Sequence, residues 1–157
     1  MGREVRRVPK DWQHPKNSAG RYEPLHDGYN AALAEFEADI KEKGLAEAID
    51  WHGGGPSSED YMPDWPESER THYMMYEDTS EGTPKSPAME SPEALARWLA
   101  DNGASSFGHD TATYEQWLPT CRGAWAPSMV MERGVIKSGV EFAAELEDRE
   151  RVSTGQD

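Results

Sequence analysis

Cysteine is almost absent from this sequence of 157 residues, which contains only Cys121. A single cysteine cannot form a disulfide within the chain, which excludes the small secreted folds that depend on such bonds. Cys121 has no neighbour in a CxxC spacing, so we expect a buried or bystander thiol rather than a redox centre. A chain of this kind suits a reducing compartment, and we expect it in the cytosol.

Long hydrophobic runs are absent as well. No apolar stretch approaches the ~18 residues that a membrane-spanning helix needs. The N-terminal segment carries charges but no apolar region of the kind found in secretory signals. We therefore expect neither a membrane protein nor a secreted one.

Positive charge is scarce and unevenly placed. The chain has 16 Lys and Arg against 30 Asp and Glu, a net charge of −14. Residues 1–20 nevertheless carry a net charge of +3, which leaves −17 for the remainder. An acidic surface repels nucleic acid and anionic lipid and attracts basic partners. The alternative interpretation is that the acidity serves only solubility.

Motifs that identify catalytic or metal sites are missing too. The glycines at 53–55 are not followed by the Lys-Ser/Thr of a phosphate-binding loop, and Ser105 and Ser106 lack a nucleophile elbow. No histidine stands in an HExxH or HxH spacing; the five are His14, His26, His52, His72 and His109. The carboxylates are too numerous to single out a catalytic pair. We therefore predict no enzymatic activity, no metal and no cofactor.

What the chain does contain indicates one folded domain with long polar loops. Hydrophobic residues make up 36% and the mean hydropathy is −0.90, but aromatics reach 10%, which argues against disorder throughout. We predict an α+β fold: a small antiparallel sheet covered by two short helices, plus an N-terminal amphipathic helix. The expected parts are an extended basic arm (1–27), an acidic helical and loop region (28–70), an α+β core (71–140), and a charged C-terminal helix with a frayed tail (141–157).

The first 70 residues contain one strong helical pattern. Three prolines favour an extended arm over 1–27, with one short strand over 4–8. Apolar residues then recur with the helical period at Tyr29, Leu33, Phe36 and Ile40, which predicts a helix over 28–43 capped by Asp27. Gly44 provides its end, and a short second helix follows from residue 45 to 49 or 51.

The region after residue 70 combines strands with two well-marked helices. Residues 71–79 read as a central strand, and residues 128–138 as a hairpin that turns at 132–134. Ser91 and Thr113 are suited to cap helices over 91–102 and 113–122. We predict that the sheet joins 71–79 to the hairpin, with 4–8 as a candidate third member, and that one core contains Leu95, Trp98, Trp117, Leu118, Tyr76 and Met129.

A family resemblance covers about half of the chain. The stretches that carry it are REVRRVP (3–9), YEDTSEGTP (76–84), SPEALARWLADNGAS (91–105), FG (107–108), YEQWL (114–118), APSMV (126–130) and SGV (138–140). In these the chain resembles uncharacterised small proteins encoded by phages and prophages. The resemblance implies no known reaction. Some members carry CxxC pairs upstream, and their absence here argues against zinc. Small acidic phage proteins without enzyme motifs are often inhibitors of host defence, which makes an anti-CRISPR-like role an expectation.

A row of carboxylates gives this expectation a mechanism. Residues four apart on a helix are separated by about 6 Å, comparable to the spacing of phosphates along a strand. The predicted partner-binding residues are Glu35, Asp39 and Glu42 on the helix, extended by Glu59, Asp60, Asp64, Glu67 and Glu69. The partner would be a host protein complex with a basic nucleic-acid-binding surface, with no direct contact to nucleic acid or membrane. The alternatives are a solvated helix face on a phage accessory or structural module, and an unrecognised enzyme.

Overall fold

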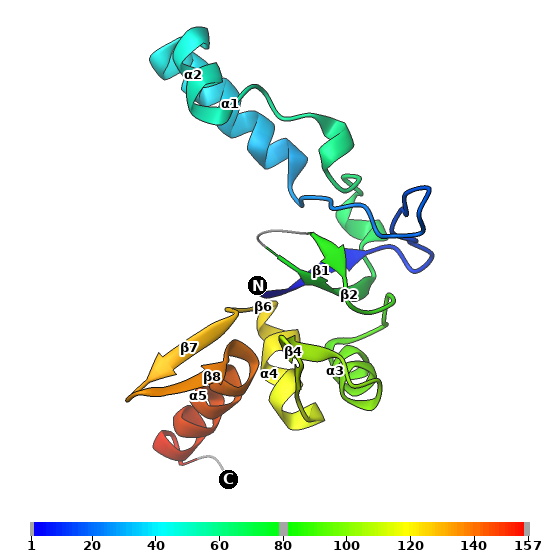
Figure 1. Ribbon diagram of the computed structural model, residues 1–157, viewed down its shortest axis with the longest axis vertical. Helices are drawn as coiled ribbons and strands as arrows, with labels where there is room; N and C mark the ends of the chain where they lie inside the picture. The colour runs from blue at the N-terminus through cyan, green and yellow to red at the C-terminus, as the bar shows by residue number, and fades with distance from the viewer. Residues whose placement is uncertain (1, 79–81, 156–157) are drawn as a thin grey trace.

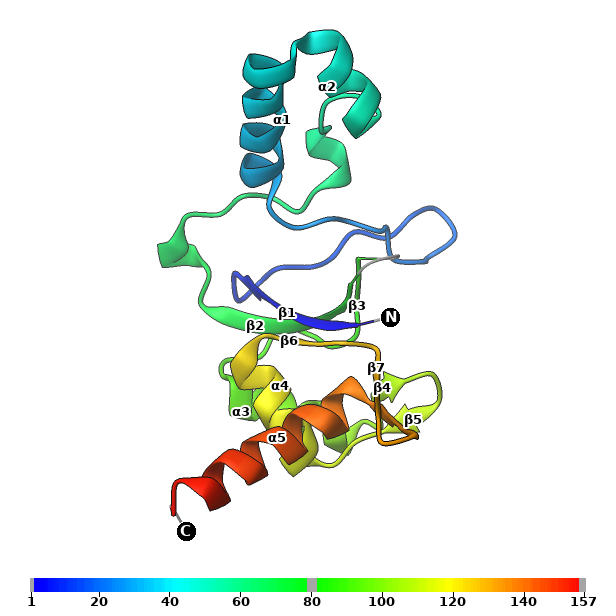
Figure 2. The ribbon, with the colours of Figure 1, turned by 90° about the vertical axis from the view of Figure 1, so that its left-hand side faces the viewer.

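The computed structural model describes residues 2–78 and 82–155 and confirms an α+β fold (Figure 1). Three tiers lie one above another in Figure 2. The helices α1 (Tyr29–Lys43) and α2 (Leu45–His52) stand at one end, and a four-stranded antiparallel sheet crosses the middle. The helices α3 (Pro92–Asp101), α4 (Tyr114–Gly123) and α5 (Gly139–Ser153) form the other end. We call the sheet face toward α3 and α4 the lower face and the opposite one the upper face.

The sheet is built on the pairing of β1 (Arg3–Val8) with β2 (His72–Glu77), which are antiparallel from Arg3↔Glu77 to Val8↔His72. The strand order is β3-β2-β1-β6, with β3 at Thr83–Pro84 and β6 at Trp125–Ala126. The strand expected over 4–8 therefore exists, but it lies inside the sheet rather than in an arm. The expected end of the second strand at residue 79 lies outside the described residues.

The lower face carries the larger core cluster. Met75 of β2 is fully buried against Leu95 and Leu99 of α3 and Trp117 of α4. Both helices begin where the sequence predicts: Ser91 Oγ accepts a hydrogen bond from the Ala94 N–H at 3.0 Å. Thr113 and Gln116 form a reciprocal capping box at the start of α4. Local capping thus fixes the two helices that cover this face.

The upper face carries a second, separate cluster. Tyr76 and Met74 of β2 are buried with Leu25 and Met62 from the loops above the sheet. The prediction of a single core is therefore wrong for Tyr76, because successive residues of a strand point to opposite faces. Met129 is also outside the core, with 53% of its surface exposed. Trp98 and Leu118 are half-buried at the edge of the lower cluster.

The predicted hairpin forms, but in a sheet of its own. The strands β7 (Met129–Glu132) and β8 (Val135–Ser138) pair only with each other. The turn lies within the expected 132–134 but has only two residues, Arg133 (φ 50°) and Gly134 (φ 81°), both in the left-handed conformation, because Glu132 pairs with Val135. The prediction that this hairpin joins 71–79 is wrong. In the main sheet β2 lies between β3 and β1 instead, and β6 pairs with the other edge of β1.

The C-terminal helix begins earlier than the expected boundary at 141. Ser138 and Glu141 form a capping box, so α5 starts at Gly139. A side chain at Gly139 would lie 1.9 Å from the Pro127 carbonyl oxygen, so only glycine permits this close approach. A second small hairpin, β4 (Ser105–Phe107) and β5 (Asp110–Thr111), was not expected from the sequence.

Two arginines of β1 are buried, one on each face. Arg3, 2% exposed, donates from Nε and Nη2 to the carbonyl and hydroxyl oxygens of Ser105, both at 2.9 Å. Arg6 donates to the Leu25 carbonyl at 2.8 Å, and its guanidinium lies 4.3 Å from the centre of the Tyr76 ring. Arg6 and the exposed Arg7 also form ion pairs with carboxylates of the chain itself, with Glu4 and Glu67 respectively. Buried charges of this kind are tolerated only when hydrogen-bonded.

A polar chain runs through the upper cluster. The Trp12 indole donates to the Tyr76 hydroxyl at 3.1 Å, and that hydroxyl lies 3.0 Å from His14 Nδ1. His14 Nε2 lies 2.6 Å from the Glu23 carbonyl oxygen. A carbonyl can only accept, so Nε2 carries the proton and Nδ1 accepts from Tyr76. Burial lowers the pKa of His14 and raises that of Tyr76 to about 12, so both groups are neutral in the folded protein.

Trp117 should be the most sensitive position of the lower cluster. Trp117→Ala removes a fully buried side chain and should cost about 3–5 kcal/mol of unfolding free energy. Trp117→Phe should cost less than about 2 kcal/mol, because the indole N–H has no hydrogen-bond partner among the described residues. Urea unfolding followed by circular dichroism measures both. An unchanged midpoint for Trp117→Ala would refute the assignment of this cluster.

Stability should fall as the solution is acidified below about pH 6.5, the pKa of an unperturbed histidine. The folded protein resists protonating His14, whereas the unfolded chain binds that proton, so stability rises with pH in this range. Unfolding free energies at pH 7.5 and 5.5 test this. Between pH 7.5 and 5.5 the unfolding free energy of the wild-type protein should fall by more than that of His14→Gln, whose side chain does not titrate. Equal losses would contradict it.

Candidate functional site

The acidic half of the predicted site forms a protrusion, which we define as residues 28–60. It consists of α1, α2, a glycine-rich loop and a short 3-10 helix, η1 (Ser58–Asp60), and it stands clear of the sheet in Figures 1 and 2. Its base is closed by backbone hydrogen bonds between His26 and the returning chain. The His26 N–H donates to the Asp60 carbonyl at 2.9 Å, and the Met62 N–H donates to the His26 carbonyl at 2.8 Å.

The helix α1 begins at Tyr29 as predicted, but Asp27 does not cap it. Gly28, with φ 81°, occupies the N-cap position, and the Asp27 carboxylate accepts from the Gly28 N–H instead. The apolar residues Leu33, Phe36 and Ile40 are only half-buried, and α1 contains no fully buried side chain. The helix therefore packs only loosely against its neighbours and leaves most of its surface to solvent.

Asp39 is less exposed than the predicted row requires. Its side chain is 17% exposed and accepts a hydrogen bond from His52 Nε2 of α2 at 2.8 Å. The His52 ring also meets Phe36 edge-on, with 5.6 Å between ring centres. The hydrogen bond from His52 lowers the pKa of Asp39. This carboxylate joins α1 to α2, so it is the wrong member of the row to substitute as a surface charge.

Glu35, Glu42, Glu59 and Asp60 are exposed and form no ion pair within the described residues. Glu35 and Glu42 are seven residues apart on one helix, about 10 Å along its axis. Glu35 and Asp60 come together at one open hollow of about 520 Å³ between α1, the glycine loop and η1. The structure thus brings together part of the predicted set.

The three remaining predicted residues lie beyond the protrusion, in the loop that covers the upper sheet face. Asp64 pairs with Arg70, and Glu67 pairs with Arg7 at 2.8 Å. Glu69 is exposed in the 3-10 helix η2 (Glu67–Glu69). Asp64 and Glu67 therefore serve as partners for the chain's own cations, whereas Glu69 forms no ion pair within residues 2–78 and 82–155.

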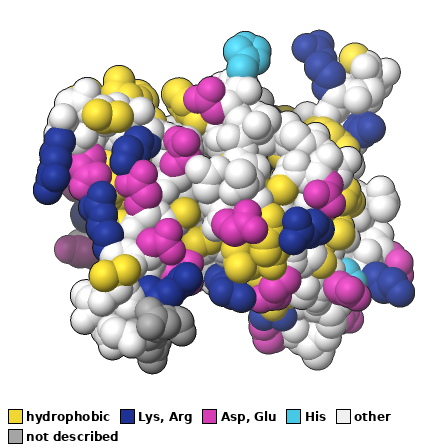
Figure 3. Space-filling view, turned by 90° about the horizontal axis from the view of Figure 1, so that it is seen from below, with side chains coloured by type: hydrophobic (Ala, Val, Ile, Leu, Met, Phe, Trp, Pro, Cys, Tyr) yellow, Lys and Arg dark blue, Asp and Glu magenta, His cyan; other side chains and the backbone are white. Residues whose placement is uncertain are grey.

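Negative charge is denser in the protrusion than in the C-terminal half of the chain. Residues 28–60 hold eight carboxylates and two lysines, a net charge of −6, whereas the much longer stretch 82–155 has a net charge of −4. Figure 3 shows the far end of the molecule, where acidic and basic side chains lie side by side over α3, α4 and α5. The acidity is thus concentrated in the protrusion and in the following stretch 61–78, which has a net charge of −4, and is weaker over residues 82–155.

An apolar surface on the protrusion was not expected from the sequence. Leu45, Ile49 and Trp51 of α2 are exposed, Trp51 to 76%. Only Ala48 of this helix is buried. The signal that could have found them is three large apolar residues in a predicted helix of only about two turns, which is too short to bury all of them. Exposed tryptophan is uncommon on free surfaces and enriched at binding hot spots.

Three further features bear on metal binding, thiol chemistry and membrane insertion. No three His, Cys, Asp or Glu side chains among residues 2–78 and 82–155 are grouped so that they could hold a metal ion. Cys121 is buried, and burial raises its pKa to about 12, which leaves the thiol unreactive. None of the helices in these ranges has both the length and the apolarity to cross a membrane. Comparison with protein-family models, curated proteins and solved structures finds no match to this chain.

The link between Asp39 and His52 should hold α2 against α1. Asp39→Asn should increase hydrogen exchange throughout α2, while Glu42→Gln, an exposed change on the same helix, should leave it unchanged. Because the pKa of Asp39 is lowered, its contribution is present above about pH 4 and is lost as pH falls through the folded value. Identical exchange in both variants would contradict this role.

Proposed function

We propose that this protein binds and inhibits a host defence or nucleic-acid-binding complex, in the manner of an anti-CRISPR protein, by presenting the acidic protrusion to a basic groove. The observation that carries the proposal is that all carboxylates of the projecting protrusion except Asp39 form no ion pair within the described residues. The likeness to phage-encoded proteins supports it and indicates the cytosol of the host cell as the place of action. Binding, rather than catalysis, is the activity proposed.

Electrostatics support this partner over others. Charges that are already paired within a protein contribute little to attraction at a distance, whereas exposed and unpaired ones steer association. Glu35, Glu42, Glu59 and Asp60 are of the second kind. They would face lysine and arginine side chains that normally hold phosphates. Such attraction weakens as salt screens it over about 8–10 Å.

The apolar residues of α2 add a reason for specific binding. Carboxylates alone would give association that is fast but weak and indifferent to the partner's shape. Trp51 offers a large exposed surface that can be buried at the centre of an interface, and Leu45 and Ile49 of the same helix are exposed as well. A groove that binds single-stranded nucleic acid combines cations with aromatic platforms, so it suits both kinds of group.

The inhibitory role can be tested in cells that carry an active CRISPR system. The wild-type protein should restore transformation by a targeted plasmid. The triple variant Glu35→Lys, Glu42→Lys, Glu59→Lys should not, since each reversal should cost about 1 kcal/mol or more of binding free energy. Together the three should weaken binding at least about a hundredfold.

A matched control separates a specific surface from general acidity. The variant Glu90→Lys, Glu115→Lys, Glu150→Lys changes the net charge by the same amount at exposed positions outside the protrusion, and it should inhibit like the wild type. Equal loss in both variants would mean that inhibition depends on the overall net charge and would refute the assignment of the protrusion as the binding surface. A wild-type protein that never restores transformation would reject this inhibitory role. Circular dichroism confirms that each variant folds.

A further inference from the structure

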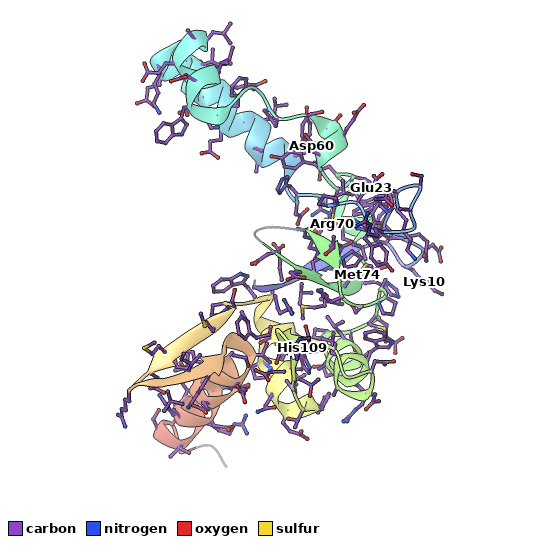
Figure 4. All side chains as sticks on the ribbon, in the orientation of Figure 1. Lys10, Glu23, Asp60, Arg70, Met74 and His109 are labelled. Atoms are coloured by element: carbon purple, nitrogen blue, oxygen red, sulfur yellow. The ribbon has the colours of Figure 1, made fainter. Side chains whose placement is uncertain are left out.

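A second hollow lies apart from the protrusion and differs from it in chemistry. It has a volume of about 380 Å³ and opens between the N-terminal loop, the residues that follow β3, and α3. The rings of Trp12, Tyr22 and Trp98 line it together with Lys10 and Lys85. Figure 4 shows Lys10 at the outer end of the N-terminal loop, well apart from Asp60 in the protrusion. We call it the aromatic hollow.

We propose that the aromatic hollow binds a nucleoside monophosphate, with the base against the aromatic rings and the phosphate at Lys10. Its volume is near the lower end of the range for small-molecule sites, which suits one nucleotide better than a dinucleotide. The proposal is independent of the inhibitory role of the protrusion.

The charge of the aromatic hollow favours an anion. None of its lining residues is acidic, although the chain contains 30 carboxylates. Lys85 is already neutralised by Glu77, at 2.7 Å. Lys10 is exposed and forms no ion pair or hydrogen bond within the described residues, so its ammonium is free to bind a phosphate. Lys16, whose ammonium lies 4.8 Å from the centre of the Tyr22 ring, adds a second cation next to one of the lining rings.

The aromatic rings are fixed in orientations that leave them available to stack on a planar base. The Trp12 indole is fixed by its hydrogen bond to Tyr76 and by edge-on packing against Trp65, with 4.8 Å between ring centres. Tyr22 is 43% exposed, and Trp98 is half-buried at the edge of the lower cluster. Aromatic side chains that are fixed and partly exposed stack well on bases, because every base has an extended π-face.

One polar side chain of the aromatic hollow is available for hydrogen bonding to a ligand. The Gln13 amide is exposed and has no hydrogen-bond partner in the described part of the chain, so it can meet the edge of a base. Ser86 offers no such group, since its hydroxyl accepts from the Met75 N–H and donates to the Pro87 carbonyl. The lining thus offers one amide, one free ammonium and three rings, which corresponds to a base and a single phosphate.

Nucleotide titration of the ¹⁵N-labelled protein tests the proposal, with the indole N–H signals as the readout. AMP or GMP at constant ionic strength should shift the signals of Trp12 and Trp98 and leave that of Trp51 in place. Adenosine, which lacks the phosphate, should bind at least about tenfold more weakly, and inorganic phosphate should not shift the indole signals. Absence of shifts at Trp12 and Trp98 up to millimolar nucleotide would overturn the site.

Two substitutions assign the contacts. Lys10→Glu should weaken AMP binding about tenfold or more, and Tyr22→Ala should weaken AMP and adenosine alike. Lys41→Glu makes the same charge change at an exposed position of α1 and should leave the affinity unchanged. Equal affinities for Lys10→Glu and Lys41→Glu would refute the phosphate contact. Tighter binding of a short single-stranded oligonucleotide than of AMP would refute the monophosphate assignment in favour of a polymer.

Discussion

The antiparallel pairing of β1 with β2 is the constraint on which the rest of the structure depends. It brings residues 3–8 against residues 72–77 and so creates a sheet with two faces to cover. The lower face gathers α3 and α4 around Met75, and the upper face gathers the loops that contain Leu25 and Met62. The base of the protrusion is closed by hydrogen bonds of His26, the residue next to Leu25, so the position of the protrusion depends on this pairing as well.

Few hydrophobic residues are needed because the sheet buries arginine stems as well. Arg3 and Arg6 point to opposite faces, and each is buried along its length with its guanidinium hydrogen-bonded to oxygen atoms. The two clusters are thin, and each contains polar groups: Arg3 with Ser105 below, and His14 with Tyr76 above. Such an interior tolerates substitutions less well than an all-hydrocarbon one, because the loss of a hydrogen-bond partner leaves a buried polar group unpaired.

The sequence predicted best what is decided within a few residues. The starts of α3 and α4 follow from Ser91 and Thr113, and the turn of the hairpin follows from Gly134. It predicted poorly what depends on distant pairing. Nothing local to the hairpin indicates that β7 and β8 stand apart from the main sheet, and a helical repeat cannot show that His52 will cover Asp39. The aromatic hollow was missed for the same reason: Lys10, Tyr22 and Trp98 meet only once the sheet has formed.

The place of β1 in the sheet also has a consequence for how the protein is made. Val8 and His72, which pair in the sheet, are 64 residues apart, so β1 leaves the ribosome well before β2 exists to receive it. During that interval a valine-rich strand would invite aggregation with other nascent chains. Its sequence, REVRRV, places four charged residues around two valines. Charges of this kind oppose the aggregation of an unpaired strand with other chains. The arginines that the native sheet buries would thus also limit aggregation of β1 before β2 has been synthesised.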